Sequence, residues 1–297
     1  MSVRPQRTIR HTVETAGVGL FTGADVRLRF RPAPTDHGVA FQRTDCPGSS
    51  PIPARIDFVV PKQRRTVIAH DGVQVELIEH VMAALSGMQI DNCLIELDGP
   101  EVPGFDGSCQ ELCELLQAAE IVEQDRLREV ISLQFPVQVS SREEDTDVTA
   151  RPMKRDGLAM TYQLDYGERA PLPPQTLTIE LTPDLFVNEI AFARTFIMQA
   201  EVDQLKAAGY GSRVTYQDLL VFDENGRVIE NELRTPDECV RHKILDCVGD
   251  FALLGSDLHG YVNAYRSGHR HNQELVRRIL SVGKSSSLPG TSHRQCG

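Results

Sequence analysis

The run from Arg241 to Asp250 places an imidazole and two carboxylates at a spacing of four residues. On an α-helix, residues four apart lie along one face, so His242, Asp246 and Asp250 would form one polar stripe. His242 and Asp246 then offer a nitrogen and an oxygen to a divalent metal, typically zinc with an open coordination position. Asp250, one turn further on, can serve another partner. The same spacing is typical of ordinary surface hydrogen bonds, so a metal site needs support from elsewhere in the chain.

A second polar pair begins another predicted helix. Apolar residues recur at helical spacing from Leu77 to Leu85, and Glu79 and His80 stand side by side near the start of this segment. Adjacent residues on a helix point about 100° apart, so one side chain can bind a metal while the other reaches the reacting water. A carboxylate in that place is the usual general base of metal-assisted hydrolysis. The alternative is a solvated Glu-His pair at a helix edge.

A third candidate follows a strand predicted over 260–265. A Ser267-Gly268-His269 turn at the end of that strand would give His269 an exposed, positioned imidazole. Asp250 could orient this ring and raise its pKa, as a general acid requires. A solvated loop histidine is the alternative.

Together with Ala193-Arg194-Thr195-Phe196, these stretches resemble the UDP-3-O-acyl-N-acetylglucosamine deacetylase family, the zinc amidases of bacterial lipid A synthesis. The resemblance covers nearly the whole chain, because 15–23, 31–34, 90–92 and 100–108 also match the family in the right order. It implies that Zn²⁺ is held by His80, His242 and Asp246. Glu79 would be the general base that activates the catalytic water.

The resemblance also implies roles for the remaining groups of the reaction. His269, oriented by Asp250, would protonate the leaving amine or stabilise the charged transition state. Thr195 would donate a hydrogen bond to the developing oxyanion. Amide hydrolysis needs a nucleophile, oxyanion stabilisation and a proton for the amine, and the set supplies one group for each.

Substrate contacts are expected from three further side chains. Lys243 would contact the polar head of the substrate, an acylated UDP-amino sugar, and Phe196 would pack on the hexose ring. Tyr166 belongs to a stretch, 165–171, that helps the family to hold the nucleotide. Of the family's Asp-Phe-Asn-His-Pro-like pattern there, only Asp165 and the aromatic Tyr166 match. Another departure is Leu77-Ile78, where the family usually has Thr-Val.

Two other functions stay open at the level of the sequence. The altered 165–171 stretch motivates a related deacetylase that acts on a different N-acyl sugar. A non-catalytic sugar-nucleotide-binding homologue could keep the metal for stability, although a structural site needs neither Glu79 nor His269. A serine hydrolase is disfavoured because the chain has no Gly-x-Ser-x-Gly elbow.

Composition narrows the partners and the compartment. The net charge of −11 argues against general nucleic-acid binding. No apolar run approaches the length of a membrane span, residues 1–11 lack the apolar core of a secretory signal, and no stable membrane anchor is evident. Seven scattered cysteines without a CxxC pair favour a reducing cytosol. We therefore expect a cytoplasmic enzyme, and a monomer.

A weak internal duplication bears on the architecture. A predicted helix over 79–87 is followed by a strand over 92–97, and a predicted helix over 236–255 is followed by the strand over 260–265. This fits the α+β architecture that the resemblance implies: two similar sandwich domains, each a sheet plus paired helices, with the metal site between them and one insertion per domain. We expect a first domain over 1–125, with an insertion at about 42–67. The second would cover 126–297, with an insertion at about 196–222 and a disordered tail from about 281.

Overall fold

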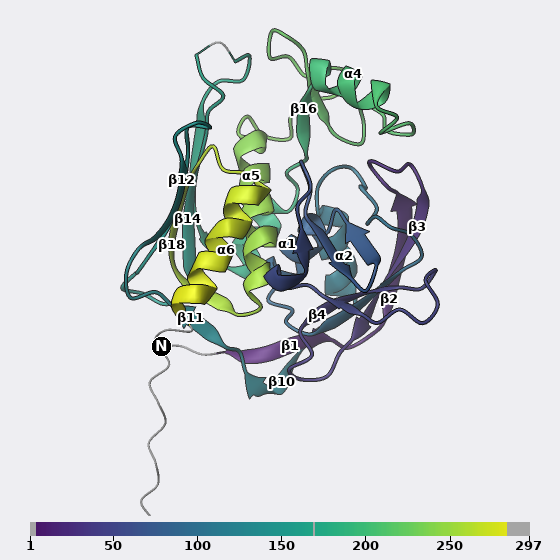
Figure 1. Cartoon of the computed structure of the whole chain (residues 1–297), viewed down its shortest axis with the longest axis vertical. Helices are drawn as coiled ribbons and strands as arrows, with labels where there is room; N and C mark the ends of the chain where they lie inside the picture. The colour runs from purple at the N-terminus through teal and green to yellow at the C-terminus, as the bar shows by residue number, and fades with distance from the viewer. Residues whose placement is uncertain (1–3, 169, 284–297) are drawn as a thin grey trace, which may run out of the picture.

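The computed structural model describes residues 4–168 and 170–283. Two sheets form the outer layers, and helices from both halves of the chain lie between them (Figure 1). The helices of this inner layer are α1 (Glu79–Gly87), α2 (Gln110–Ala118), α5 (Glu238–Phe251) and α6 (His269–Gly283). The predicted α+β class is confirmed, and the helices predicted over 79–87 and 236–255 are α1 and α5.

The first sheet comes from the N-terminal half of the chain. Its spatial order is β2 (Val13–Val18), β3 (Asp25–Pro32), β9 (Cys93–Leu97), β4 (Val39–Arg43) and β5 (Ile52–Pro53). The last of these strands along the chain, β9, is inserted in the middle, antiparallel to β3 and parallel to β4.

The second sheet repeats this topology in the C-terminal half. Its order is β12 (Val137–Ser141), β13 (Thr146–Arg151), β18 (Asp257–Tyr265), β14 (Leu158–Leu164) and β15 (Gln175–Leu181), with β11 (Val130–Ser132) pairing beside β18. Here too the last strand is inserted, antiparallel to β13 and parallel to β14. Each inserted strand follows one helix and precedes another, α1 and α2 around β9 and α5 and α6 around β18. The duplication that the sequence only suggested is therefore present in the fold.

Burial follows the layers. Side chains along β3 and β18 alternate between buried and more exposed positions, because one face of each sheet packs on helices and the other meets solvent. Helix α1 is different, since eight of its nine residues are buried. A helix that is buried around its whole circumference lies inside a protein, as α1 does between the two halves. Its buried polar residues, Glu79 and His80, therefore stand out from their surroundings.

The two halves meet where α1 packs on α5. Gly249 of α5 lies against the backbone of Glu79, so closely that a Cβ on Gly249 would lie 2.1 Å from the Glu79 carbonyl oxygen. Only hydrogen fits at this position. The contact sets the start of α1, and with it Glu79 and His80, against the middle of α5.

Charged residues join the halves at the end remote from α4. The boundary expected between residues 125 and 126 falls within β10 (Ile121–Leu127), which pairs antiparallel with β1 (Pro5–Ile9). Beside these strands, Arg4 contacts Asp91 at 2.7 Å and Asp257 at 2.9 Å, and Arg128 contacts the same carboxylates at 3.0 and 3.2 Å. Asp91 belongs to the N-terminal half and Asp257 to the C-terminal half, so each arginine bridges the two.

The segments expected as insertions lie outside the paired helices. Segment 42–67 contains β5, a helical turn, Ile56–Phe58, and β6 (Val59–Val60). It ends at the start of β7 (Val67–His70), and β6 and β7 form a small separate sheet with β8 (Val73–Glu76). Segment 196–222 contains β16 (Phe196–Met198), α4 (Gln199–Ala207) and β17 (Leu220–Phe222), and β16 pairs parallel with β17. Figure 1 shows α4 and β16 at one end of the molecule.

The C-terminal segment is described only in part. The tail expected from about 281 begins inside α6, which runs to Gly283, and 284–297 lie outside the described residues. Among the described residues, none of the helices combines the length and the apolar character that a membrane crossing requires.

The contact at Gly249 yields a first prediction. Gly249→Ala should lower the free energy of unfolding by about 1–3 kcal/mol, because the added methyl group overpacks the α1–α5 contact. Alanine favours a helix over glycine by only about 1 kcal/mol, which offsets part of this loss. Denaturant unfolding measures the change. Gly268→Ala is the control, because a Cβ there meets no atom within 4 Å. Equal stability of the two variants would contradict the close contact.

Candidate metal centre

Three metal-ligating side chains converge where α1 meets α5. His80 comes from the first turn of α1, and His242 and Asp246 lie one turn apart on α5. Their ligand atoms all lie within 4.8 Å of one another, and all three residues are buried. The spacing of four residues on α5 therefore places two of the predicted ligands together, and the helix crossing brings the third.

The geometry of this cluster fits a zinc ion. Tetrahedral zinc with bonds of ~2.0–2.1 Å holds neighbouring ligand atoms ~3.3 Å apart. His242 Nε2 lies 3.4 Å from Asp246 Oδ1, and His80 Nε2 lies 3.9 Å from the same oxygen. Small shifts of these side chains would bring the three ligand atoms to bonding distance of one ion. Three protein ligands leave one position open, which is typical of catalytic rather than structural zinc.

The charge states of the ligands also suit a cation. The Nδ1 atom of His242 lies 3.1 Å from the Ala193 carbonyl, to which it donates, so the lone pair of Nε2 faces the cluster. Burial lowers the pKa of His242, and burial together with the neighbouring His242 lowers the pKa of His80 to about 3, so both rings are neutral. Burial opposes ionisation of Asp246, but Lys243, 2.7 Å away, holds the pKa of Asp246 below its usual range.

Glu79 lies beside the ligands without belonging to them. Its Oε2 atom accepts a hydrogen bond of 2.9 Å from the Thr66 backbone N–H. Burial is the main cause that raises the pKa of Glu79, to about 7. A carboxylate with a pKa near neutrality can both accept and release a proton, as a general base must. Glu79 thus combines a buried position next to the ligand His80 with a pKa suited to proton transfer.

His269 and Asp250 form a pair beside Glu79. His269 Nδ1 lies 2.9 Å from Asp250 Oδ2, and His269 Nε2 lies 3.8 Å from Glu79 Oε1. Burial disfavours the charged ring, but the carboxylate of Asp250 outweighs it and raises the pKa of His269 to about 10. We expected an exposed imidazole, whereas only 13% of the His269 side chain is exposed, because Asp250 of α5 and Glu79 of α1 flank it.

Thr195 is brought to the cluster by the loop before β16. Its Oγ1 lies 3.2 Å from His242 Nε2 and 3.1 Å from the Gly107 carbonyl oxygen. The preceding residue, Arg194, holds this loop through a buried ion pair with Glu238, at 2.7 Å, at the start of α5. An oxygen atom of a molecule bound between Thr195 and the three ligands would therefore lie within reach of the Thr195 hydroxyl.

The three residues expected to contact the substrate lie along one side of the cluster. The Phe196 ring is 6.2 Å from the His242 ring and 6.4 Å from the Tyr166 ring, centroid to centroid. Tyr166 is 55% exposed, so it lies at the outer end of this aromatic wall. The Lys243 ammonium donates to Asp246 Oδ2, a contact that sequence reasoning did not predict.

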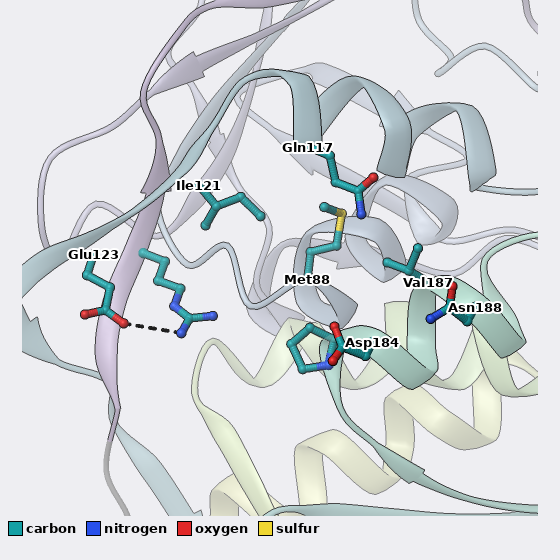
Figure 2. Close-up of a pocket in the computed structure, with 9 residues that line it drawn as sticks. Met88, Gln117, Ile121, Glu123, Asp184, Val187 and Asn188 are labelled. Carbon is teal, nitrogen blue, oxygen red and sulfur yellow. Dashed lines mark hydrogen bonds and ion pairs between the residues drawn. The ribbon is translucent and has the colours of Figure 1, made fainter.

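Two cavities elsewhere contain none of the predicted site residues. The smaller one lies between the ends of α1 and α2, β10, the turn α3 (Pro183–Leu185) and the following turn Phe186–Ile190, and Figure 2 shows its lining. Arg7 and Glu123, both in its lining, form an ion pair of 3.3 Å. The larger cleft includes Arg4, Arg128 and Asp257, which join the two halves. Both cavities are therefore separate from the metal cluster.

Thr66 is a contact residue that sequence reasoning missed. Its backbone N–H binds Glu79, and its hydroxyl donates to Asp250 Oδ1 at 2.7 Å. Thr66 lies in the segment predicted as an insertion, 42–67, where no spacing or motif points to the metal. Asn272, which donates to Asp250 Oδ2 at 2.8 Å, closely follows Ser267-Gly268-His269, and that proximity is the signal that could have found it.

The ligand geometry yields a second prediction. His80→Ala should lower the zinc bound per purified chain to less than about a tenth, because two remaining ligands hold the ion far more weakly than three. Metal analysis of the dialysed protein measures this. His11→Ala is the control. The His11 side chain is exposed and is not one of the three ligands, so this variant should keep its zinc. Full zinc occupancy of His80→Ala would rule out this ligand set.

Similarity to known proteins extends over most of the chain, as the motifs indicated. A family model described as UDP-3-O-acyl N-acetylglycosamine deacetylase matches residues 6–281. UDP-3-O-acyl-N-acetylglucosamine deacetylase from Myxococcus xanthus (strain DK1622) is 39% identical over 93% of this chain and 86% of the relative. Proteins of the same name from Anaeromyxobacter sp. (strain Fw109-5) and Idiomarina loihiensis (strain ATCC BAA-735 / DSM 15497 / L2-TR) are 38% and 36% identical, over 93% of this chain and 88% and 90% of each relative. The chain therefore belongs to the UDP-3-O-acyl-N-acetylglucosamine deacetylase family.

Proposed function

We propose that this protein hydrolyses the N-acetyl amide of UDP-3-O-acyl-N-acetylglucosamine in a zinc-dependent reaction, giving UDP-3-O-acyl-glucosamine and acetate for lipid A biosynthesis. The observation that carries this proposal is the close arrangement of a metal-ligand set, a separate carboxylate and a histidine–aspartate pair in one buried cluster. Membership in the deacetylase family supports the substrate.

The reaction needs a nucleophile that is strong at neutral pH. Zinc, when bound by His80, His242 and Asp246, would supply this by lowering the pKa of a water molecule and by polarising the amide carbonyl. Glu79 accepts the proton of the attacking water on Oε1, the oxygen that lies 3.8 Å from His269 Nε2, while Oε2 is held by Thr66. The water oxygen forms a bond to the acetyl carbon, and the former carbonyl oxygen becomes negatively charged.

Collapse of this tetrahedral species requires stabilisation of the oxyanion and a proton for the nitrogen. The Thr195 hydroxyl donates to the oxyanion, turning from the Gly107 carbonyl that it contacts in this structure. His269 carries a proton on Nε2, because Asp250 holds Nδ1–H and raises the pKa of the ring. That proton goes to the amine as the C–N bond breaks, and acetate and the free amino sugar result.

The groups along the aromatic wall would hold the sugar. Phe196 offers its ring face to the hexose, and the more exposed Tyr166 extends this surface toward the nucleotide. Lys243 follows the ligand His242 and contacts the ligand Asp246, and it carries a positive charge because Asp246 raises the pKa of its ammonium despite burial. A charge in this place suits the polar head of an acylated UDP-amino sugar.

We further propose that the enzyme acts in the cytoplasm as a monomer. Within the described residues, the cysteines between Cys46 and Cys247 carry free thiols, which suits a reducing compartment. One chain supplies the ligands, the base and the acid, so a single copy is sufficient for the reaction.

A specific observation also favours a second candidate, a deacetylase with a different head group. The stretch that departs from the family pattern begins with Asp165, and Asp165 contacts the Arg266 guanidinium at 3.1 Å. Asp145 contacts the same guanidinium at 2.8 Å. Because two carboxylates contact this one guanidinium, they compensate the positive charge with which Arg266 could bind a diphosphate.

Competition by UDP separates the two candidates. If the enzyme recognises the nucleotide, millimolar UDP should inhibit amine release by raising KM for the substrate while leaving kcat unchanged. Steady-state kinetics at several UDP concentrations measure this, with uridine as the control that lacks phosphates. Absence of inhibition would favour another acylated amino sugar as the substrate.

The role of Glu79 yields a prediction that tests catalysis itself. Glu79→Gln should lower kcat at least ~100-fold, because an amide cannot accept the proton of the attacking water. Zinc content should equal that of the wild type, since Glu79 is no ligand. Glu14→Gln, an exposed carboxylate on β2, is the matched control. Near-normal turnover by Glu79→Gln would contradict the mechanism, and an inactive but zinc-loaded wild type would favour a non-catalytic sugar-nucleotide binder.

A further inference from the structure

Thr66 connects the two proton-transfer groups of the cluster. It lies immediately before β7, in the small sheet of the N-terminal half, and only 1% of its surface is exposed. Its backbone N–H donates to Glu79 Oε2 at 2.9 Å, and its hydroxyl donates to Asp250 Oδ1 at 2.7 Å. One residue thus binds the candidate proton acceptor and the carboxylate that orients the candidate proton donor.

A third contact holds the Thr66 hydroxyl oxygen. Gln273 of α6 donates from Nε2 to Thr66 Oγ1 at 3.0 Å, and both side chains are buried. A hydroxyl has a single hydrogen, so an oxygen that accepts from Gln273 is free to donate its hydrogen to Asp250. The ionised carboxylate of Asp250 can only accept, so the Thr66 hydroxyl donates to Asp250 while its oxygen accepts from Gln273.

The other oxygen of Asp250 has its own donors. Oδ2 accepts from His269 Nδ1 at 2.9 Å and from Asn272 Nδ2 at 2.8 Å. The Ser267 hydroxyl donates to Asn272 Oδ1 at 3.0 Å and so sets the orientation of that amide. Within the described part of the chain, Oδ1 receives its side-chain hydrogen bond from Thr66. Without Thr66, this end of the fully buried carboxylate would lose its donor.

We propose that Thr66 is a positioning residue that holds Glu79 and the Asp250–His269 pair at a fixed separation across the contact of the two halves. The inference rests on the proposed hydrolysis. Glu79 belongs to α1, Asp250 to α5 and His269 to α6, so backbone continuity alone does not set their distance. Thr66 adds two hydrogen bonds between them.

The separation matters because both groups act on one amide. Glu79 Oε1 and His269 Nε2 lie 3.8 Å apart, with the bonds from Thr66 on the far side of each carboxylate. A shift of about 1 Å in a reacting group can cost about 100-fold in rate. Loss of the hydroxyl should therefore slow turnover through the orientation of His269, while the sugar-binding side chains keep their places.

Thr66→Val tests this inference, because valine keeps the shape and the backbone N–H of threonine and removes the hydroxyl. Compared with the wild type, kcat should fall about tenfold or more, as expected for the loss of a hydrogen bond to a charged group. KM should stay within about twofold and zinc content should be unchanged. Thr66→Ser, which restores the hydroxyl, should recover most of kcat. An unchanged kcat in Thr66→Val would overturn the inference.

Two controls distinguish positioning from a general effect on the fold. Thr8→Val removes another buried hydroxyl, which donates to the Asn92 carbonyl at 2.7 Å, and should leave kcat unchanged. In a His269→Ala background, Thr66→Val should have little further effect, because Thr66 acts on turnover through Asp250 and His269. An equal loss of kcat in both backgrounds would contradict this.

A second variant covers the case in which valine prevents folding. Gln273→Leu leaves Thr66 in place but removes the amide that donates to its hydroxyl oxygen and helps to hold that side chain, so kcat should fall about threefold at unchanged KM. An unchanged kcat would overturn the inference. Failure of the inference is distinguishable from failure of the proposed function. If the wild type is active and Thr66→Val has the same kcat, the inference about Thr66 alone is overturned. If the wild type is loaded with zinc but releases no amine, both this inference and the proposed function are overturned.

Discussion

The close approach of α1 to α5 is the constraint on which the site depends. Gly249 lets the backbone of Glu79 lie directly on α5, which leaves no room for a side chain at position 249. Because of this contact, His80 of one half meets His242 and Asp246 of the other at ligand distances. The same contact brings Glu79 to His269. A metal centre at this seam can exist only while the two halves stay together.

The repeated topology explains how such a seam arises. Each half presents its helices on one face of a sheet, and the two helical faces pack against each other in the middle (Figure 1). Ionisable groups buried there are stabilised by partners rather than by water. Asp246 has Lys243, Asp250 has Thr66, Asn272 and His269, and Glu238 has Arg194. The result is a dry, pre-organised set of charges, which favours catalysis over simple binding.

Local patterns predicted much of this arrangement, because helical spacing is a property of neighbouring residues. The positions of His242, Asp246 and Asp250 on α5 follow from it, and so does the place of Glu79 and His80 at the start of α1. The family resemblance then brought these segments together. Neither helical spacing nor the family resemblance predicted the other contacts between residues far apart in the sequence. Nothing in the sequence around Thr66 shows that it meets Asp250, 184 residues away, and the burial of His269 depends on packing between helices. The insertion of β9 and β18 into the middle of their sheets likewise depends on pairing over long distances.

The central claim is that this cluster, loaded with zinc, hydrolyses an N-acetyl amide. Its most direct test is amine release from UDP-3-O-acyl-N-acetylglucosamine by the purified protein as isolated, after chelation, and after zinc is added back. The account predicts activity that disappears on chelation and returns with zinc. A folded, zinc-loaded protein that releases no amine from this substrate would contradict it.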